Sequence, residues 1–442
     1  MVETNDKIHI VTLGCSKNTV DSEVLLKQFQ ENRWQLAGEY SNADVLVINT
    51  CGFIEEAKNE SIQAILEAVE LKKQGTVKKV VVMGCLSERY ASDLRKEIPG
   101  VDAFIGANKM DQVVATLGGD YKNELLGERL ITTPQHYAYL KISEGCDNPC
   151  SFCAIPIMRG GHVSKPIERV LLEAQRLAAL GVREIIIIAQ DSTYYGLDRY
   201  GKRMLPSLLE QLTAVDGIEW IRLMYAYPAK FPLDLLDIYN ASDKLCRYID
   251  MPVQHVNDEV LKSMRRGISM RALRELIETM RDRVPGLAVR TTLIVGYPNE
   301  TESAFTDLHR FVEEVEFDRL GVFTYSQEDD TTAFPLGDPI PMQVKEERRR
   351  IIMTTQQAIS RRKNEGMIGK IVRIVVDRIE GDCAIGRTER DAPEIDNEVI
   401  VHNAVRCKVG EFYDVEIEDA EDFDLFAALP SNVEIDRSSL LV

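Results

Sequence analysis

Three cysteines stand within eight residues of one another, at Cys146, Cys150 and Cys153. Three thiolates on one loop can hold three irons of a 4Fe-4S cube and leave the fourth iron without a protein ligand. Small-molecule chemistry at a metal requires an open coordination position of this kind. A zinc knot and chance clustering are the alternatives. Structural zinc takes four ligands, and the candidate fourth, His162, lies nine residues further on with no partner after it. The spacing therefore favours an iron-sulfur cluster.

Three more cysteines, Cys15, Cys51 and Cys85, are 36 and 34 residues apart, and each follows an expected strand. Parallel strands end at the same edge of a sheet, so these thiols should arrive together. Each has a glycine beside it, which allows the backbone to approach a bulky ligand closely. A single buried cysteine is usually a small core hydrophobe, but three at equivalent positions favour a second three-thiolate cluster. The remaining cysteines lack this arrangement and are expected to be structural: Cys246, Cys383 and Cys407.

The elements that must position the second triad lie in a first domain, residues 5–120. Short, β-branched, mostly apolar runs alternate there with stretches of helical spacing. The expected strands are 8–13, 45–48 and 80–83, and the expected helices are 20–33 and 54–73. This alternation predicts a doubly wound parallel sheet in an α/β domain. The glycine-rich segment at 118–120 is expected to begin a linker.

A second strand-helix series occupies residues 132–365 and contains the first triad. Six strand-helix units are too few for a closed eightfold barrel, so we expect a partial (β/α)6 TIM-like barrel with its chemistry at the carboxyl ends of the strands. The expected strands are 139–142, 184–189, 220–225, 248–253, 289–295 and 320–325. The expected helices are 168–180, 205–214, 233–239, 270–283 and 302–314, followed by a long charged helix at 343–364.

The pattern changes again in residues 366–435, where short alternating strands with turn residues predict a small antiparallel β-barrel resembling OB-type folds. From residue 366 to the C-terminus there are 8 Lys or Arg and 18 Asp or Glu, a net charge of −10 out of −18 for the chain. Phosphate neutralisation dominates the affinity of RNA-binding modules, so an acidic module should be repelled by RNA and attract a basic protein. The acidic run at 416–422 is also compatible with a merely soluble strand end.

Together, the two cysteine triads resemble the methylthiotransferase family, and the resemblance covers essentially the whole chain. The spacing CxxxCxxC, with an aromatic residue before the last cysteine, resembles the signature of radical S-adenosylmethionine enzymes. In this family a cysteine-triad domain precedes a radical S-adenosylmethionine barrel and a small C-terminal barrel called TRAM. Four segments resemble the branch that modifies a ribosomal protein rather than the sister branch that modifies tRNA adenosine: residues 13–23, 49–54, 155–160 and 386–394.

The resemblance implies that sulfur is inserted and a methyl group added at the β-carbon of an aspartate in small-subunit ribosomal protein S twelve. Such a C–H bond has no acidic proton, so we expect a radical rather than a side-chain acid or base to break it, with cofactors carrying the hard step. The implied cofactors are two 4Fe-4S clusters, one on each cysteine triad, and two equivalents of S-adenosyl-L-methionine, as radical source and methyl donor. An electron donor of the flavodoxin or ferredoxin type and a sulfur source are also implied.

Polar residues at other strand ends are the expected cosubstrate contacts. Gln190 and Asp191 follow the second barrel strand, Gln254 and His255 follow the fourth, and Gly296 follows the fifth. For each of them alone, an ordinary loop role is an equally good interpretation, and His255 is equally compatible with a packing role.

Composition limits the other classes of function. A net charge of −18 and a pI near 5.0 argue against non-specific phosphate binding and favour a basic partner. No window approaches about 18 consecutive apolar residues and the acidic start has no apolar stretch, so we expect a cytoplasmic protein without membrane spans.

Two alternative functions stay open from the sequence. A tRNA-modifying enzyme could use a local basic groove, for which basic runs occur at 265–266, 348–350 and 361–363. Glutamates beside the arginines of the long helix favour a self-paired, solvated face there. A non-enzymatic iron-sulfur scaffold would normally enclose its cluster with four protein ligands.

Overall fold

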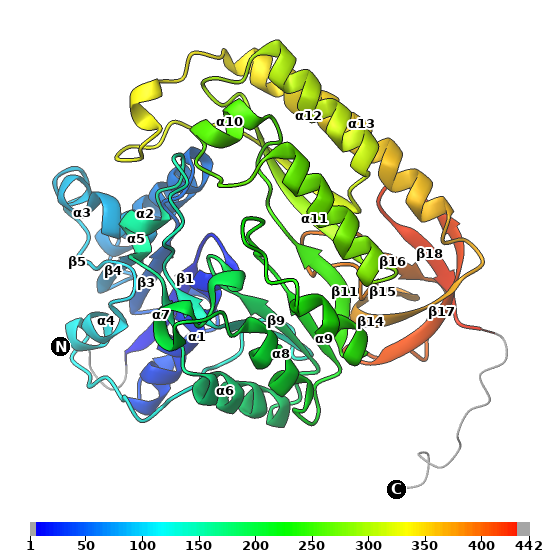
Figure 1. The fold of residues 1–442 in the computed structure, drawn as a ribbon. Helices are drawn as coiled ribbons and strands as arrows, with labels where there is room; N and C mark the ends of the chain where they lie inside the picture. Colours follow the sequence, from blue (N-terminus) through cyan, green and yellow to red (C-terminus); the bar gives the residue numbers. More distant parts are fainter. Residues whose placement is uncertain (1–5, 431–442) are drawn as a thin grey trace, which may run out of the picture.

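The computed structural model describes residues 6–430. Figure 1 shows three units in chain order, with the first coloured blue to cyan, the second green to yellow and the third orange to red. Residue 5 and residues 431–435, which the expected first and third domains include, lie outside the described residues.

The first unit is a five-stranded parallel sheet in the order β2-β1-β3-β4-β5 with helices on both faces, which confirms the predicted doubly wound fold. One apolar core packs α1 and α4 against one face, and another packs α2 and α3 against the other. The central strand β3 is buried along its whole length because both faces are covered. The elements are β1 (Lys7–Thr12), α1 (Ser16–Glu31), β2 (Gln35–Leu36), β3 (Val45–Thr50), α2 (Glu55–Lys73), β4 (Lys79–Gly84), α3 (Cys85–Glu97), β5 (Ala103–Phe104) and α4 (Met110–Thr116).

The second unit is the predicted six-stranded partial barrel, with strands in the order β13-β12-β11-β10-β9-β6, all parallel. Its strands are β6 (Tyr137–Lys141), β9 (Glu184–Ile188), β10 (Trp220–Leu223), β11 (Leu245–Asp250), β12 (Ala288–Val295) and β13 (Arg319–Thr324). Its longer helices are α6 (Ile167–Ala179), α8 (Leu205–Thr213), α9 (Leu235–Ala241), α11 (Met270–Arg283), α12 (Glu302–Val315) and α13 (Met342–Glu365). Shorter elements at the carboxyl ends of the strands are β7 (Ser143–Glu144), α5 (Ile155–Arg159), β8 (Val163–Ser164), α7 (Leu197–Tyr200) and α10 (Asp258–Ser263).

The third unit is a closed five-stranded barrel in the order β14-β15-β16-β18-β17. The predicted barrel is confirmed, but it is not wholly antiparallel, because β16 and β18 pair in parallel. The strands are β14 (Ile371–Glu380), β15 (Cys383–Thr388), β16 (Val399–Val401), β17 (Phe412–Ala420) and β18 (Leu425–Ala428).

The third unit covers the open barrel at the amino ends of its strands. Val375, Ala392 and Phe412 of the third unit share an apolar cluster with barrel residues, including Trp220, whose ring centroid lies 4.9 Å from that of Phe412. Because this end of the barrel is covered, the carboxyl ends of the strands are the face available for chemistry.

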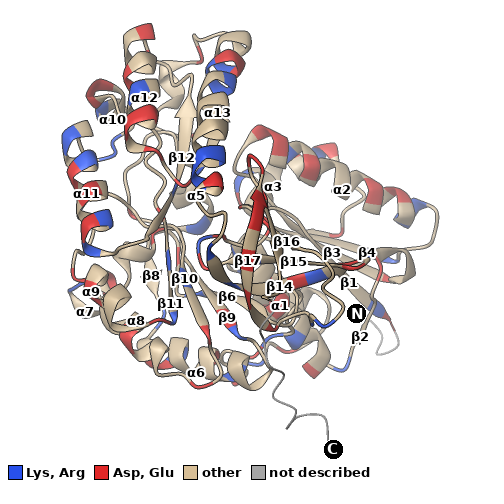
Figure 2. Ribbon diagram, turned by 90° about the vertical axis from the view of Figure 1, so that its right-hand side faces the viewer, with Lys and Arg blue, Asp and Glu red and all other residues tan. Residues whose placement is uncertain are grey.

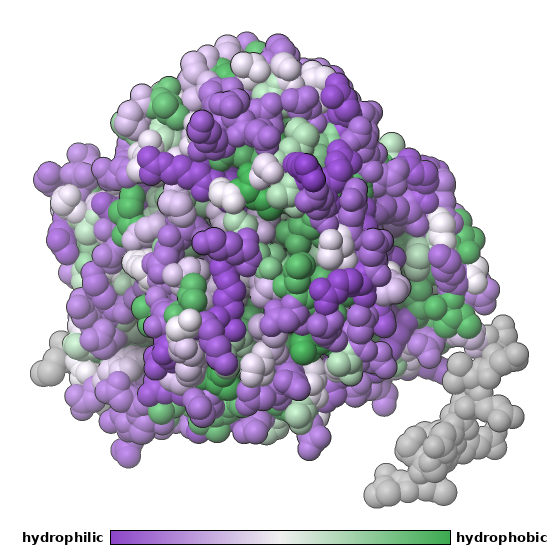
Figure 3. Space-filling model, in the orientation of Figure 1, coloured by the Kyte–Doolittle hydropathy of each residue, from purple (hydrophilic) through white to green (hydrophobic). Residues whose placement is uncertain are grey.

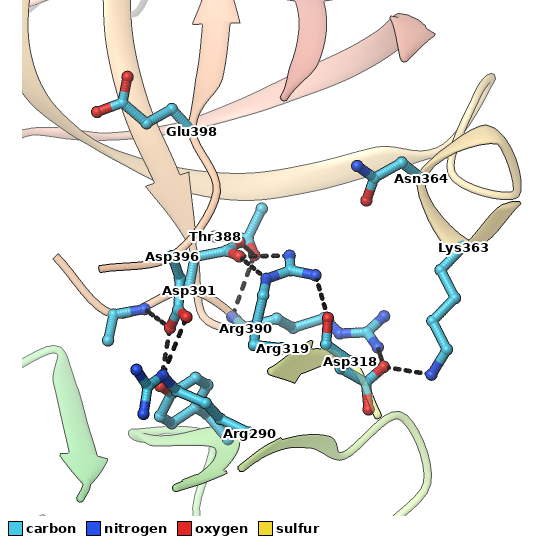
Figure 4. A network of polar contacts seen from close by, with 12 residues as sticks. Arg290, Asp318, Arg319, Lys363, Asn364, Thr388, Arg390, Asp391, Asp396 and Glu398 are labelled. Atoms are coloured by element: carbon cyan, nitrogen blue, oxygen red, sulfur yellow. Dashed lines mark hydrogen bonds and ion pairs between the residues drawn. The ribbon is translucent and has the colours of Figure 1, made fainter. Parts of the chain in front are cut away.

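Buried ion pairs reinforce this contact, as the network in Figure 4 shows. Arg290 of β12 pairs with Asp396 at 3.2 Å, and Arg390 pairs with Asp318 at 2.9 Å. Arg319 binds Asp391. The charge count from the sequence treated all carboxylates of the third unit as available to a basic partner. In the structure, several of them instead contact residues of the second unit: Asp377, Glu389, Asp391, Glu394 and Asp396.

Among residues 6–430, no helix is long and apolar enough to cross a bilayer. The face drawn in Figure 3 is predominantly hydrophilic, and its hydrophobic residues form small separate groups.

Candidate functional site

The loop of the first cysteine triad leaves the carboxyl end of β6 and is tied to the turn after α5. The Cys146 N–H donates to the Gly160 carbonyl at 3.1 Å. Gly145 has φ of +69°, and a Cβ there would lie 2.1 Å from the Gly161 carbonyl oxygen. Only glycine fits this close backbone approach, so the residue before Cys146 sets the entry of the loop.

Polar groups surround the central cysteine of this loop. Arg266 Nη1 lies 3.2 Å from Cys150 Sγ, and the Tyr227 hydroxyl lies 3.6 Å from the same sulfur. The guanidinium also stacks on the Tyr227 ring, with 4.3 Å to the centroid. The Arg266 side chain is buried and donates to the Pro252 carbonyl as well. These contacts fix the position of the Cys150 sulfur within the loop.

The three sulfurs interact electrostatically. Burial raises the pKa of the Cys146 thiol to about 11 and that of Cys153 to about 12, and the charge of Cys150 adds to both shifts. Backbone N–H groups of Asn148 and Ile155 act in the opposite direction at Cys146 and Cys153. Because ligands bind metal as thiolates, filling this site releases protons.

The second triad converges as the sheet topology predicts. Cys15 is the N-cap residue of α1, Cys51 follows β3, and Cys85 opens α3 directly after β4. A Cβ at Gly14 would lie 2.7 Å from Cys51 Cβ, and one at Gly52 would lie 2.9 Å from the Cys85 carbonyl carbon. Cys15 is exposed, Cys51 partly buried and Cys85 buried. Burial raises the pKa of Cys51 to about 11, with further contributions from Cys15 and Cys85. The two glycines permit this close packing.

The spacing of the donors distinguishes a cube from a single ion. No group of three His, Cys, Asp or Glu side chains in residues 6–430 is gathered tightly enough to hold one metal ion. In a 4Fe-4S cube each thiolate binds a different iron, so its ligands stand further apart than around zinc. His162, the possible fourth zinc ligand, instead places Nε2 3.1 Å from Ser164 Oγ. His162 is therefore occupied in a local contact and does not join the three thiols of the first triad.

One arginine joins the second triad to the segment that carries the first triad. Arg159 ends α5, just after the first triad, and its Nε donates to Cys85 Sγ at 3.4 Å. Its Nη1 pairs with Asp21 of α1 at 2.9 Å and with Glu144 at 3.0 Å. Lys141 pairs with the same two carboxylates. Helices α3 and α5 are in contact, and Figure 1 shows α5 beside the first unit. The two triads thus meet at one interface between the first and second units.

A cavity of about 150 Å³ opens at this interface. Its walls come from the loop after Cys51, from Phe152 in the loop of the first triad, from the segment after β11, and from β12, β13 and the residues after β13. The lining residues are Phe53, Ile54, Phe152, Gln254, Thr292, Ile294, Phe323, Thr324, Tyr325, Ser326 and Glu328. A larger cavity of about 620 Å³ lies beside α6 and includes Lys27 and Arg176, whereas the smaller one is lined by Phe53 and Phe152, which neighbour the cysteines of the two triads in the chain.

Three of the five residues predicted as cosubstrate contacts lie near the triad or the cavity. Asp191 is buried and accepts from Asn148 Nδ2 in the cysteine loop at 2.8 Å, beside the partly buried Gln190. Gln254 lines the cavity, has φ of +70° and buries its Oε1 without a hydrogen-bond partner among the described residues. An orphaned acceptor facing a cavity suits a ligand that donates a hydrogen bond.

The other two predicted contacts have structural partners. His255 is fully buried, with Nδ1 accepting from the Asn257 N–H at 3.0 Å and Nε2 3.3 Å from Glu300. Gly296 has φ of +77°, and a Cβ there would lie 2.3 Å from Lys345 Cγ. Neither residue lines the cavity. Their local roles are to pack α13 and the loop after β12.

Sequence reasoning missed the arginines of the site. Arg266 was noted only as part of a basic run that could contribute to an RNA-binding groove, and Arg159 was part of a family-like segment with no role attached. An arginine six residues after a cysteine triad and followed by glycine carries no signal of its own. The pairing of Arg159 with Asp21 spans 138 residues and exists only in the folded chain.

The partial barrel carries a loop with three cysteines at the carboxyl ends of its strands. This combination defines an enzyme of the radical S-adenosylmethionine superfamily. The model described as the radical SAM superfamily matches residues 140–312, the one described as uncharacterized protein family UPF0004 matches residues 7–106, and the one described as the TRAM domain matches residues 368–429. The chain belongs to the family of ribosomal protein uS12 methylthiotransferases.

Similarity to curated relatives carries this assignment. Two proteins named ribosomal protein uS12 methylthiotransferase RimO are similar to almost the entire chain. The one from Christiangramia forsetii is 53% identical over 433 residues, covering 98% of this chain and 96% of that protein. The one from Chloroherpeton thalassium is 52% identical over 433 residues, covering 97% and 100%.

A solved structure shares the fold. The radical S-adenosylmethionine methyltransferase TsrM from Kitasatospora setae, solved with cobalamin and a [4Fe-4S] cluster, matches with a TM-score of 0.55 at 13% identity. The match covers 75% of this chain and 77% of that one. At this identity the likeness concerns the fold alone.

Proposed function

We propose that this enzyme attaches a methylthio group to the β-carbon of an aspartate in ribosomal protein uS12. The observation that carries the proposal is the meeting of two cysteine triads at one interface, in a chain 53% identical to a protein named for that reaction. Cys146, Cys150 and Cys153 hold one 4Fe-4S cluster. Cys15, Cys51 and Cys85 hold the other. The proposed place of action is the cytoplasm, where ribosomal proteins are present.

When bound, the two clusters and S-adenosylmethionine supply the electron path, the radical, the sulfur site and the methyl group. The protein positions these groups. Phe53, Phe152 and Phe323 form apolar walls of the cavity at the interface. Arg266 and Tyr227 hold the loop of the first triad through Cys150. The electron is proposed to come from a flavodoxin or ferredoxin type of donor.

The third unit is proposed to dock the basic substrate. Its strand β17 alternates buried Val415 and Ile417 with exposed Asp414, Glu416 and Glu418. Figure 2 shows β17 as a largely red strand. These carboxylates remain available to a partner, in contrast to those turned toward the second unit. Acidic surfaces steer basic proteins and repel the phosphates of RNA, so this strand supports uS12 over tRNA as the substrate.

A product analysis tests the proposed reaction. Wild-type cells and cells lacking this protein are compared by mass spectrometry for a methylthio increment on uS12 and on tRNA. We expect the increment on uS12 to disappear with the protein and the tRNA modifications to persist. Loss of a methylthio group from tRNA alone would assign the enzyme to the other substrate.

Purified variants test the ligand assignment. Anaerobically purified protein should contain about eight irons per chain, and replacement of Cys15, Cys51 and Cys85 by Ala should leave about four. Cys150→Ala should abolish cleavage of S-adenosylmethionine, whereas the matched control Cys383→Ala, in the third unit, should retain iron and cleavage. Eight irons in the triple variant would contradict the second cluster.

Charge reversal on β17 tests the docking surface. Glu416→Lys with Glu418→Lys should weaken uS12 binding about tenfold at low salt, with the difference shrinking as ionic strength rises. The control reverses Glu67 and Glu70 on α2, which are equally exposed. Equal effects of the two double variants would show that net charge, rather than β17, governs binding.

A further inference from the structure

A buried lysine without an anionic partner lies between the two triads. Lys17 is in the first turn of α1, two residues after Cys15, and is 4% exposed. Its Nζ lies 3.0 Å from the centroid of the Tyr225 ring. Among residues 6–430, the Lys17 ammonium has neither a hydrogen bond nor an ion pair. Lysine is seldom buried without a partner, and a ring face compensates for only part of the lost hydration.

Tyr225 holds this ammonium at the functional end of the barrel. It follows β10, and its φ of +61° is uncommon for a residue other than glycine. Its N–H donates to Asp250 at 3.1 Å, and its carbonyl accepts from the Ser192 N–H at 3.0 Å. These contacts tie the ring to the carboxyl ends of β9, β10 and β11. Lys17 therefore spans the interface from the Cys15 loop to the barrel.

The other cations near the triads already have partners. Lys141 and Arg159 share the carboxylates of Asp21 and Glu144. Arg266 donates to Cys150 Sγ and to a backbone carbonyl. In contrast to Lys141 and Arg159, Lys17 has no carboxylate partner among the described residues. An anion from outside the chain would complete it.

We infer that Lys17 binds the carboxylate of the substrate aspartate. The inference rests on the proposed function, which places an aspartate at this site. A carboxylate oxygen and the β-carbon are bonded to the same carbon, so they lie roughly 2.4 Å apart. Fixing the carboxylate on Lys17 therefore fixes the β-carbon next to the Cys15 side of the site. The same contact selects aspartate over asparagine, because an amide is neutral and presents N–H donors to the ammonium.

A double-mutant cycle measures this contact by binding. Wild-type holoenzyme and Lys17→Gln holoenzyme, both without reductant so that no turnover occurs, are titrated with uS12 and with uS12 carrying asparagine in place of the target aspartate. A charge-assisted contact predicts that wild type binds the aspartate form roughly 10- to 100-fold more tightly. The Lys17→Gln enzyme should bind both forms alike. Lys17→Arg should recover part of the discrimination, and the control Lys27→Gln, on the same helix, should keep all of it.

Several results would overturn the inference. Full discrimination by Lys17→Gln, or equal weakening of both substrates, would show that Lys17 does not contact the carboxylate. A higher S-adenosylmethionine requirement for uncoupled cleavage in Lys17→Gln would assign the lysine to the cosubstrate instead. Failure of the proposed function has a different signature, since wild-type enzyme would then form no methylthio product on uS12 at all.

Discussion

Replacing Arg159 by Met should loosen the docking of the first unit on the second. The side chain of Arg159 is 1% exposed and its removal leaves Asp21 and Glu144 with Lys141 as their remaining cation. Breaking a buried pair by removing one partner costs about 3–5 kcal/mol. Because Lys141 stays, we expect the low end, about 3 kcal/mol, which corresponds to a roughly 100-fold larger population of the undocked state.

Tryptic cleavage after Arg129 measures that population. Arg129 is buried between the units, where it pairs with Glu23 of α1 at 2.9 Å and with Glu173 of α6 at 3.4 Å. Trypsin can reach it only after the interface opens, and cleavage follows the open population when reclosing is fast. The cleavage rate should rise about 100-fold in Arg159→Met.

The matched control for this experiment is Arg349→Met, which removes an arginine that is half exposed and paired with Glu346 on its own helix. Its cleavage rate should stay close to that of wild type, since such surface pairs contribute little. A rise of less than about threefold in a folded Arg159→Met protein would refute the idea that this network holds the units together.

Three further perturbations probe the site and the interface of the third unit. Gly52→Ala places a Cβ 2.8 Å from the Leu86 backbone, so it should displace the start of α3 and lower the iron content from about eight to about four per chain. Arg266→Gln removes a cation next to Cys150, so the reduced and more negative state of the first cluster loses stabilisation. The midpoint potential of this cluster should fall by about 60 mV in a redox titration followed by electron paramagnetic resonance. Burial alone would raise the pKa of Asp318, but Lys363 and Arg390 outweigh it and lower that pKa. The ionised carboxylate therefore stabilises the fold above the usual aspartate pKa near 4, and this contribution is lost as the pH falls through the lowered value. The difference in thermal stability between wild type and Asp318→Asn should accordingly begin to shrink as the pH falls below about 4 and vanish only below the lowered pKa.

Regular amphipathic elements could be predicted from the sequence because local signals agree there. The helix expected at 270–283 has those bounds in the structure, and Ser269 caps it by accepting from the Ala272 N–H. Helix α3 escaped notice because Cys85–Glu97 is rich in charged residues and has few apolar ones. Strand β18 has four residues, too few for a period to show.

The convergence of the six cysteines into two triads was predictable, but their surroundings were not. Parallel strands of known order deliver Cys15, Cys51 and Cys85 to one sheet edge whatever the side-chain packing. In contrast, the placement of Lys17 over Tyr225 depends on how two separately folded units meet. The charge count of the third unit shows the same limit, because composition cannot say that Asp391 and Asp396 are bound to barrel arginines.

The contacts between the units explain why buried charge belongs in this site. The apolar cluster that joins the triads is small, consisting of Cys85, Ala154 and Met158 with Ile155 at its edge, and such a patch could slide. An ion pair fixes direction and register even where it adds little net stability. Bond formation between a carbon and a sulfur held by different units requires the reacting atoms to approach within about 3–3.5 Å, so a slip of about 1 Å can cost 100-fold in rate. The Arg159 network restrains that slip. We therefore regard it as part of the functional site, in the same sense as the cysteines whose separation it sets.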